Sequence, residues 1–150
     1  MLAFLIGIVA GLRAFTPVAV VSWASSLGWL HVRGTGLGFL GHPAAAYIFS
    51  ALALVELVTD KLPGTPSRKV PIQFGARIVL GALCGAALGI SGQSVLAGLI
   101  AGVMGAIVGT LGGAATRARL AKAVGKDLPA ALLEDIVAIG TSILLIWSMK

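Results

Sequence analysis

Four carboxylates beside long apolar segments are the residues of this sequence best suited to chemistry: Glu56, Asp60, Glu134 and Asp135. Glu56 and Asp60 are four residues apart, so on a helix they share one face and lie about 6 Å apart along the axis. Glu134 and Asp135 are adjacent and open the last apolar segment. Carboxylates this close to hydrocarbon are costly and usually face the protein interior, a partner charge or water. We therefore expect all four to form one cluster.

Three interpretations of this cluster remain open. In the first, the carboxylates are structural: the earlier two pair with basic residues, and the later two stabilise the start of a helix through its dipole. The candidate basic partners are Lys61, Arg77 and Arg117. In the second, three or four of them converge and bind a metal or another hard cation through oxygen, or share protons because they cannot all ionise together. In the third, they form an acidic docking site for a partner protein.

Arg13 is the second unusual residue, because it lies within an apolar segment and a guanidinium cannot lose its charge. At that depth it must face protein or a water-filled cavity. Pro17 has no N–H, so the carbonyl of Arg13 lacks its helical partner and the helix can open there. Arg13 then either pairs with Glu56 or another acid, or binds an anionic group such as a lipid phosphate or a substrate carboxylate. The predicted substrate-path or anion-binding residues are Arg13, Thr16, Lys61 and Arg77.

The elements that must position these residues are apolar helices. Of the 150 residues, 58% are hydrophobic and only 11% charged, against roughly 25% charged in a typical soluble domain. With a mean hydropathy of +1.04, a soluble fold of this size could not bury its apolar surface. The composition predicts an all-α membrane helix bundle, a single domain over residues 1–150. It excludes a conventional soluble enzyme, a nucleic-acid-binding protein and a disordered chain, and neither an enzymatic activity nor a cofactor is expected.

A membrane-spanning helix needs about 20 residues, and the sequence predicts five such helices. The predicted segments are residues 2–24, interrupted at Arg13 and Pro17; 43–60; two helices within 78–116, separated by a turn at 91–94; and 129–149. The pairs on either side of the third helix would run in opposite senses, which allows an inverted repeat. The single Cys84 lies in an apolar run and is expected to be a packing residue.

Basic residues between the predicted helices indicate the orientation of the chain. They follow the second and the fourth helices, so the two loops share a side, which is expected to be cytoplasmic. These residues are Lys61, Arg68, Lys69, Arg77, Arg117, Arg119, Lys122 and Lys126. In a cell (inner) membrane the N-terminus would then be cytoplasmic and the C-terminus outside. Trp23, Trp29 and Trp147 would form an aromatic belt at the outer interface.

Glycines recur every four residues in the third and fourth predicted helices, as in small-xxx-small packing between membrane helices. The three series are Gly81, Gly85 and Gly89; Gly98 and Gly102; and Gly105, Gly109 and Gly113. We expect these stripes to pack helices closely, with sliding between conformations or contact between two copies of the chain as alternatives. The expected partners are membrane lipids, a second copy of the chain and a small ion or solute.

Residues 56–63 spell E-x-x-x-D-K-x-P, and three further features accompany them. They are Arg77 before a Gly/Ala-rich helix, the late Glu134-Asp135, and Gly11-Leu12-Arg13 with Pro17 in the first segment. Together these features resemble a family of small bacterial multi-pass membrane proteins, domain of unknown function 4126, over nearly the whole chain. The resemblance implies no activity, but it implies that the residues at 56, 60, 61, 134 and 135 belong to a family signature. A looser similarity to cation/proton exchangers with a Glu-x-Gly-Asp-Lys motif is analogy alone.

The sequence therefore favours a small transporter or channel-like protein for a cation or a proton-coupled solute, using the carboxylate cluster on the cytoplasmic side. The alternative is a non-transporting structural or lipid-binding membrane module whose charges form internal salt bridges. Unpaired polar groups in hydrocarbon cost several kcal/mol each, so both functions require these charges to find partners.

Overall fold

The computed structural model describes residues 1–150 except 63–69, 93, 126 and 149, and the described residues are all-helical, as predicted. The helices are α1 (Leu2–Leu12), α2 (Phe15–Ser26), the short 3₁₀ helix η1 (Gly38–Gly41), α3 (Pro43–Thr59), α4 (Pro71–Ser91), α5 (Val95–Val124) and α6 (Asp127–Trp147). Of these, α4, α5 and α6 are long and apolar enough to cross a membrane, and α1 and α3 are shorter apolar helices. The chain is a membrane protein.

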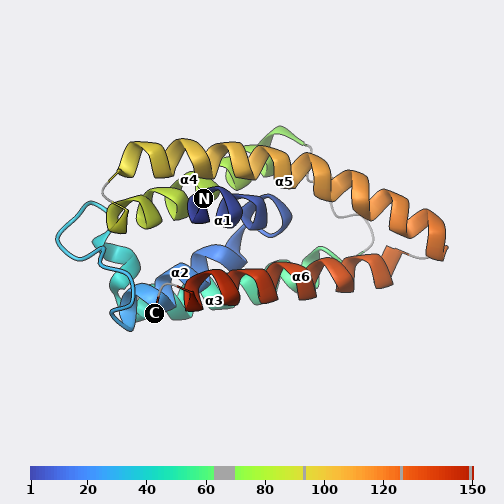
Figure 1. Cartoon of the computed structure of the whole chain (residues 1–150). Coiled ribbons are helices and arrows are strands. Elements are labelled where there is room, and N and C mark those ends of the chain that lie inside the picture. The colour runs from blue at the N-terminus through green and yellow to red at the C-terminus, as the bar shows by residue number, and fades with distance from the viewer. Residues whose placement is uncertain (63–69, 93, 126, 149) are drawn as a thin grey trace.

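The helices run between two ends of the bundle (Figure 1). We call one the loop end, which holds residues 27–42 and the turn between α4 and α5. The other is the charged end, where Arg117 near the end of α5 contacts Asp60 after α3 and Asp127 at the start of α6. Accordingly, α3 and α5 run toward the charged end, whereas α4 and α6 run back to the loop end.

The first predicted crossing, over residues 2–24, is wrong: α1 and α2 form a hairpin. Gly7 lies against Gly102 and Gly11 against Ala106, so α1 runs in the same direction as α5, toward the charged end. The chain then turns, and α2 packs against α3 and α6 on its way back to the loop end. The first residues therefore lie toward the same end of the bundle as the C-terminus, although the sequence predicted the termini on opposite sides.

The hairpin turns where Arg13 and Pro17 predicted an opening of the helix. Arg13 is extended, with φ −137° and ψ 118°, and so ends α1. Pro17 falls in the first turn of α2, where a helix makes no use of its backbone N–H groups and the fixed φ of proline is tolerated. The proline therefore helps to begin a new helix instead of kinking an existing one.

The remaining boundaries show which sequence signals end a helix. Pro43 begins α3 as predicted, and Nδ1 of His42 accepts a hydrogen bond from the N–H of Ala44 (3.2 Å). In contrast, α4 starts earlier and α5 ends later than predicted, so four basic residues assigned to loops lie within helices: Arg77, Arg117, Arg119 and Lys122. Charge alone did not end α5, which stops at Gly125 in the left-handed conformation (φ 73°). Among the residues used in the predictions, Pro63, Arg68, Lys69, Gln93, Lys126 and Met149 lie outside the described residues.

The glycine stripes hold α1, α4 and α5 together. A Cβ atom on Gly85 would come within 3.0 Å of the Gly98 and Gly102 backbones, so the predicted close packing between these two helices is confirmed. Further along α5, a Cβ on Gly105 or Gly109 would meet the backbone of α1 in the same way. Gly105 and Gly109, from the third series, therefore pack α1 of the hairpin against α5.

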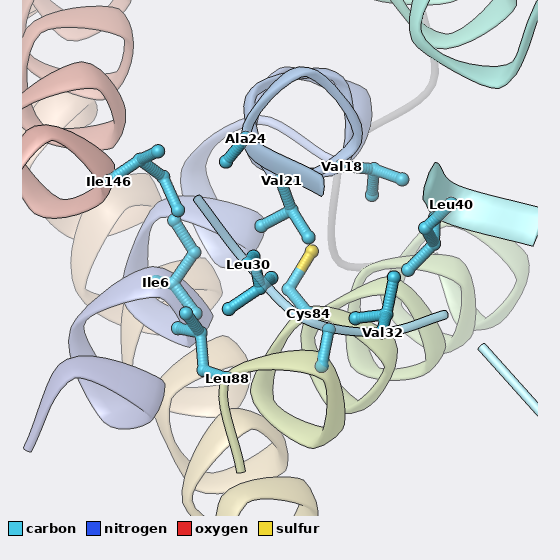
Figure 2. Packing of buried hydrophobic residues seen from close by; sticks show 11 residues of the cluster. Ile6, Val18, Val21, Ala24, Leu30, Val32, Leu40, Cys84, Leu88 and Ile146 are labelled. Carbon is cyan, nitrogen blue, oxygen red and sulfur yellow. The ribbon is translucent and has the colours of Figure 1, made fainter. Parts of the chain in front are cut away.

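Apolar side chains close the loop end of the bundle (Figure 2). The cluster combines residues of α1, α2, α4 and α6 with the segment that follows α2. Its buried members are Ile6, Val18, Val21, Ala24, Leu30, Val32, Leu40, Cys84, Ala87, Leu88 and Ile146. Cys84 is fully buried among them, in agreement with its predicted packing role.

Candidate functional site

A cluster of charged side chains occupies the charged end and surrounds the tip of the α1–α2 hairpin. It contains all five carboxylates of the chain together with four basic residues. The members of this charged cluster are Arg13, Glu56, Asp60, Lys61, Arg77, Arg117, Asp127, Glu134 and Asp135. The expectation that the carboxylates of two distant segments share one region is met.

Arg13 lies at the centre of the cluster and is completely buried. Its NH1 atom is 2.8 Å from Oδ2 of Asp60, and its NH2 atom contacts Oδ1 of Asp135. On its other side, Asp135 accepts a hydrogen bond from Nζ of Lys61 (2.5 Å). The predicted pairing of Arg13 with an acid is confirmed, and the acids are two aspartates from α6 and the end of α3.

Arg117 links this centre to the edge of the cluster. Its NH1 atom donates to Asp60 (2.6 Å), while Nε and NH2 form a fork on Asp127 (3.0 and 2.6 Å). Glu134 lies further away, at 3.8 Å from NH1. Asp127 was missed from the sequence, although an acid shortly before Pro129 is a recognisable signal of a helix start.

Glu56 holds the start of α2. Its Oε1 accepts a hydrogen bond from the N–H of Ala14 (2.8 Å), and its Oε2 accepts one from the N–H of Phe15 (2.9 Å). A carboxylate at this position satisfies two N–H groups that have no helical partner and also complements the positive end of the helix dipole. A residue of α3 thereby fixes the second half of the hairpin.

Arg77 does the equivalent for the end of α1. Its NH1 atom donates to the carbonyl oxygens of Gly11 (3.0 Å) and Leu12 (2.6 Å), which the break leaves without helical partners. The hydroxyl of Thr110 donates to the same Gly11 carbonyl (3.2 Å). Because NH2 of Arg77 also lies 3.6 Å from Oε1 of Glu56, the two caps support each other electrostatically.

The charged cluster contains the residues on which the family resemblance rests: Glu56, Asp60, Lys61, Glu134 and Asp135. The model of the family described as domain of unknown function (DUF4126) matches residues 1–147. The chain belongs to the DUF4126 family. Searches of curated proteins and of solved structures found no match. The DUF4126 chain is a membrane protein whose acidic residues gather at one end of the bundle.

A cavity of about 260 Å³ opens beside the hairpin tip of this DUF4126 chain. Its walls come from α2, α3 and α4 and include Glu56, Asp60 and Arg77. Gln73 and Thr59 add neutral polar groups to the same walls. Two of the predicted carboxylates, Glu56 and Asp60, and one predicted basic residue, Arg77, therefore line a cavity large enough to hold water molecules.

The four carboxylates of the predicted ion site do not converge as a ligand set. Within the part of the chain that the structure describes, no group of three or more His, Cys, Asp or Glu side chains could hold a metal ion. Instead, each of the four approaches a basic side chain. Thr16 was predicted to line the substrate path together with Arg13, Lys61 and Arg77. It is buried in the first turn of α2 and is not a member of the charged cluster.

Proposed function

We propose that this chain is a membrane transport protein for a cation or a proton-coupled solute, with the buried part of the charged cluster at the hairpin tip as its working site. The observation that carries the proposal is the position of Arg13, completely buried between Asp60 and Asp135 at the break of a helix. Discontinuous helices that end inside the bundle, near paired charges, are typical of transporter sites. Ionisable residues within membrane segments commonly line ion or proton pathways.

The arrangement can change its pairing without losing all of its contacts. Asp60 has two basic partners, Arg13 and Arg117, and Asp135 has two, Arg13 and Lys61. Protonation of either aspartate, or binding of a cation beside it, would weaken its hold on Arg13 and thus the contacts at the hairpin tip. Because the cavity reaches Asp60, protons or small ions would approach from that side.

The charged end is proposed to face the cytoplasm of a cell membrane. Arg119 and Lys122 lie on α5 at this end, beyond the ion pairs, and the rule that positive residues remain inside favours this orientation. A small ion or solute, membrane lipids and a second copy of the chain are the proposed partners, and no enzymatic activity is proposed.

Flux through reconstituted protein tests the transport proposal. Wild-type protein in liposomes is expected to move protons when a gradient of Na⁺ or K⁺ is imposed, as measured with a pH-sensitive dye trapped inside. Asp60→Asn and Asp135→Asn are each expected to reduce this flux at least tenfold. Asp127→Asn is the matched control, because Asp127 is an acid of the same cluster that is largely exposed. Absence of flux in the folded wild-type protein would contradict transport, and equal flux in all three variants would contradict Asp60 and Asp135 as the residues that carry it.

The second candidate function is a non-transporting structural or lipid-binding module. The pairing of each predicted carboxylate with a basic side chain favours it, because a network of this kind is sufficient to hold the hairpin without any transport. Under this function Arg13→Met or Asp135→Leu alone destabilises the protein, whereas the double variant recovers most of the lost stability. Thermal unfolding with anionic lipids, cations and varied pH separates the candidates, since a specific ligand raises the midpoint.

A further inference from the structure

An apolar groove lies between α5 and α6 at the charged end. Its volume is about 340 Å³, within the range of about 300–1,000 Å³ that is typical of ligand pockets. α1 contributes Ile8 and Leu12 to its walls. Val108 of α5 and Leu133 and Val137 of α6 also line it, and each of these three residues is about half exposed. In a membrane, this apolar surface has to be covered by lipid or by protein.

The length of the groove matches one leaflet of a bilayer. It follows α5 from Val108 to Leu120, about 18 Å at 1.5 Å per residue. Half of a hydrocarbon core of about 30 Å is about 15 Å. Residues 95–116 of α5 carry no charge, and basic residues begin at Arg117. The apolar part of the groove therefore lies at the depth of lipid tails, and its outer end lies at the level of the head groups.

The width of the groove suits a single hydrocarbon chain. Spread over this length, its volume corresponds to a mean cross-section of about 19 Å². A helix with its side chains is about 10–12 Å in diameter and is too broad to enter. Gly112 lines the groove, and a Cβ atom added there would meet nothing within 4 Å. The space beside Gly112 is therefore open.

Arg119 adds a positive charge at the outer end of the groove. It is exposed and makes no ion pair with any described residue, whereas Arg117 is held by Asp60 and Asp127. Arg119 follows Gly112 by about two helical turns, so the two residues lie on the same side of α5. Helical side chains tilt toward the N-terminus of their helix, which directs the guanidinium of Arg119 back toward the groove. A guanidinium is well suited to bidentate binding of a phosphate.

We propose that this groove binds one anionic phospholipid, with an acyl chain beside Gly112 and the phosphate of the head group at Arg119. Lys122 favours an anionic head group, because it is exposed near Arg119 and has no ion pair with a described residue. Glu134 also lines the groove, but it lies only 3.8 Å from NH1 of Arg117. The site gives a position to the lipid partner proposed above and rests on that partner. It stands whether or not the protein transports ions.

Native mass spectrometry of the full chain released from detergent tests the site. The probe is palmitoyl-oleoyl phosphatidylglycerol, and phosphatidylcholine with the same chains is the comparison. Wild-type protein is expected to bind one phosphatidylglycerol at least tenfold more tightly than phosphatidylcholine. Gly112→Leu fills the groove and is expected to weaken this binding at least tenfold. Gly140→Leu is the matched control, because a Cβ on Gly140 also meets nothing within 4 Å and Gly140 does not line the groove. Equal binding by the two variants, or equal binding of the two lipids by wild type, would overturn the proposal.

Arg119→Gln tests the head-group contact in a variant that leaves the groove itself unchanged. It is expected to weaken phosphatidylglycerol binding at least fivefold. Lys122→Gln removes the same charge about 60° further round α5, away from the groove, and is expected to change binding less than twofold. Equal losses in these two variants would overturn the proposal. So would a wild-type dimer that dissociates in Gly112→Leu, because a second copy would then cover the groove. Phosphatidylglycerol binding by a wild-type protein without ion flux would support the lipid site and contradict transport alone.

Discussion

At the scale of single residues, the charged cluster illustrates how a broken helix is stabilised inside an apolar bundle. The break leaves carbonyl oxygens at the end of α1 and N–H groups at the start of α2 without partners in their own helices. Arg77 from α4 binds the first set, and Glu56 from α3 binds the second. Each side chain also places its charge where the adjacent helix dipole is complementary.

Glu56→Gln is expected to lower the free energy of unfolding by about 3 kcal/mol, because it removes the charged cap of α2 and leaves Arg77 without its nearby acid. Chemical denaturation in detergent, followed by circular dichroism, measures this change. Asp127→Asn is the comparison, since the exposed pair of Asp127 with Arg117 is expected to contribute less than about 1 kcal/mol. Equal losses in the two variants would show that Glu56 is not a buried cap.

At the scale of elements, close contact between helix backbones positions the hairpin. Gly7 and Gly11 of α1 meet α5, and Gly102 of α5 meets both α1 and α4. In a membrane, where lipid tails are as apolar as side chains, van der Waals contact between backbones replaces much of the hydrophobic driving force. The tip of the hairpin reaches its caps because α1 lies this close to α5.

Two glycines of α5 provide a matched pair of substitutions. A Cβ on Gly102 would lie within 3.0 Å of the Gly81 backbone, whereas a Cβ on Gly112 would meet nothing within 4 Å. Gly102→Ala is therefore expected to destabilise the protein by at least 2 kcal/mol, on the order of an overpacked core. Gly112→Ala is expected to stabilise it by up to about 1 kcal/mol through helix propensity. Changes in the free energy of unfolding, relative to wild type, that have the same sign in both variants would contradict this packing.

At the scale of the whole molecule, the hairpin changes how the chain is threaded. The sequence predicted an N-terminus on the side of the basic loops, because a first segment of this length and hydropathy resembles one crossing. In the structure α1 enters from the loop end and α2 returns there, so both chain ends lie toward the same end (Figure 1).

Protease protection of epitope tags on oriented vesicles measures this topology. Tags at the N-terminus and at the C-terminus are expected to be cleaved from the same side. A tag inserted at Gly125, at the charged end, is expected to be cleaved only from the opposite side. Cleavage of the two terminal tags from opposite sides would restore the single crossing predicted from the sequence.

The sequence predicted the class of the fold, the membrane and the residues of the charged cluster other than Asp127, since composition and isolated charges in apolar segments are strong signals. It found the break at Arg13 but not the reversal of direction, because periodicity within a segment carries no information about its neighbours. It placed Arg77 in a loop, since a charge beside an apolar run resembles a boundary. The specific partners, such as Glu56 with two N–H groups of α2, depend on contacts between segments far apart in the chain.

The burial of Arg13 has a consequence for how the protein is made. The ribosome synthesises Arg13 early, but one of its two acidic partners, Asp135, is near the end of the chain. Until Asp135 emerges, the guanidinium of Arg13 lacks one of its two acidic partners. Release of the first segment from the translocon into lipid is then unfavourable, because the charge is not fully paired. We therefore expect the first helices to be held at the membrane surface or within the insertion machinery during synthesis, so that the earliest part of the chain is the last to reach its final position.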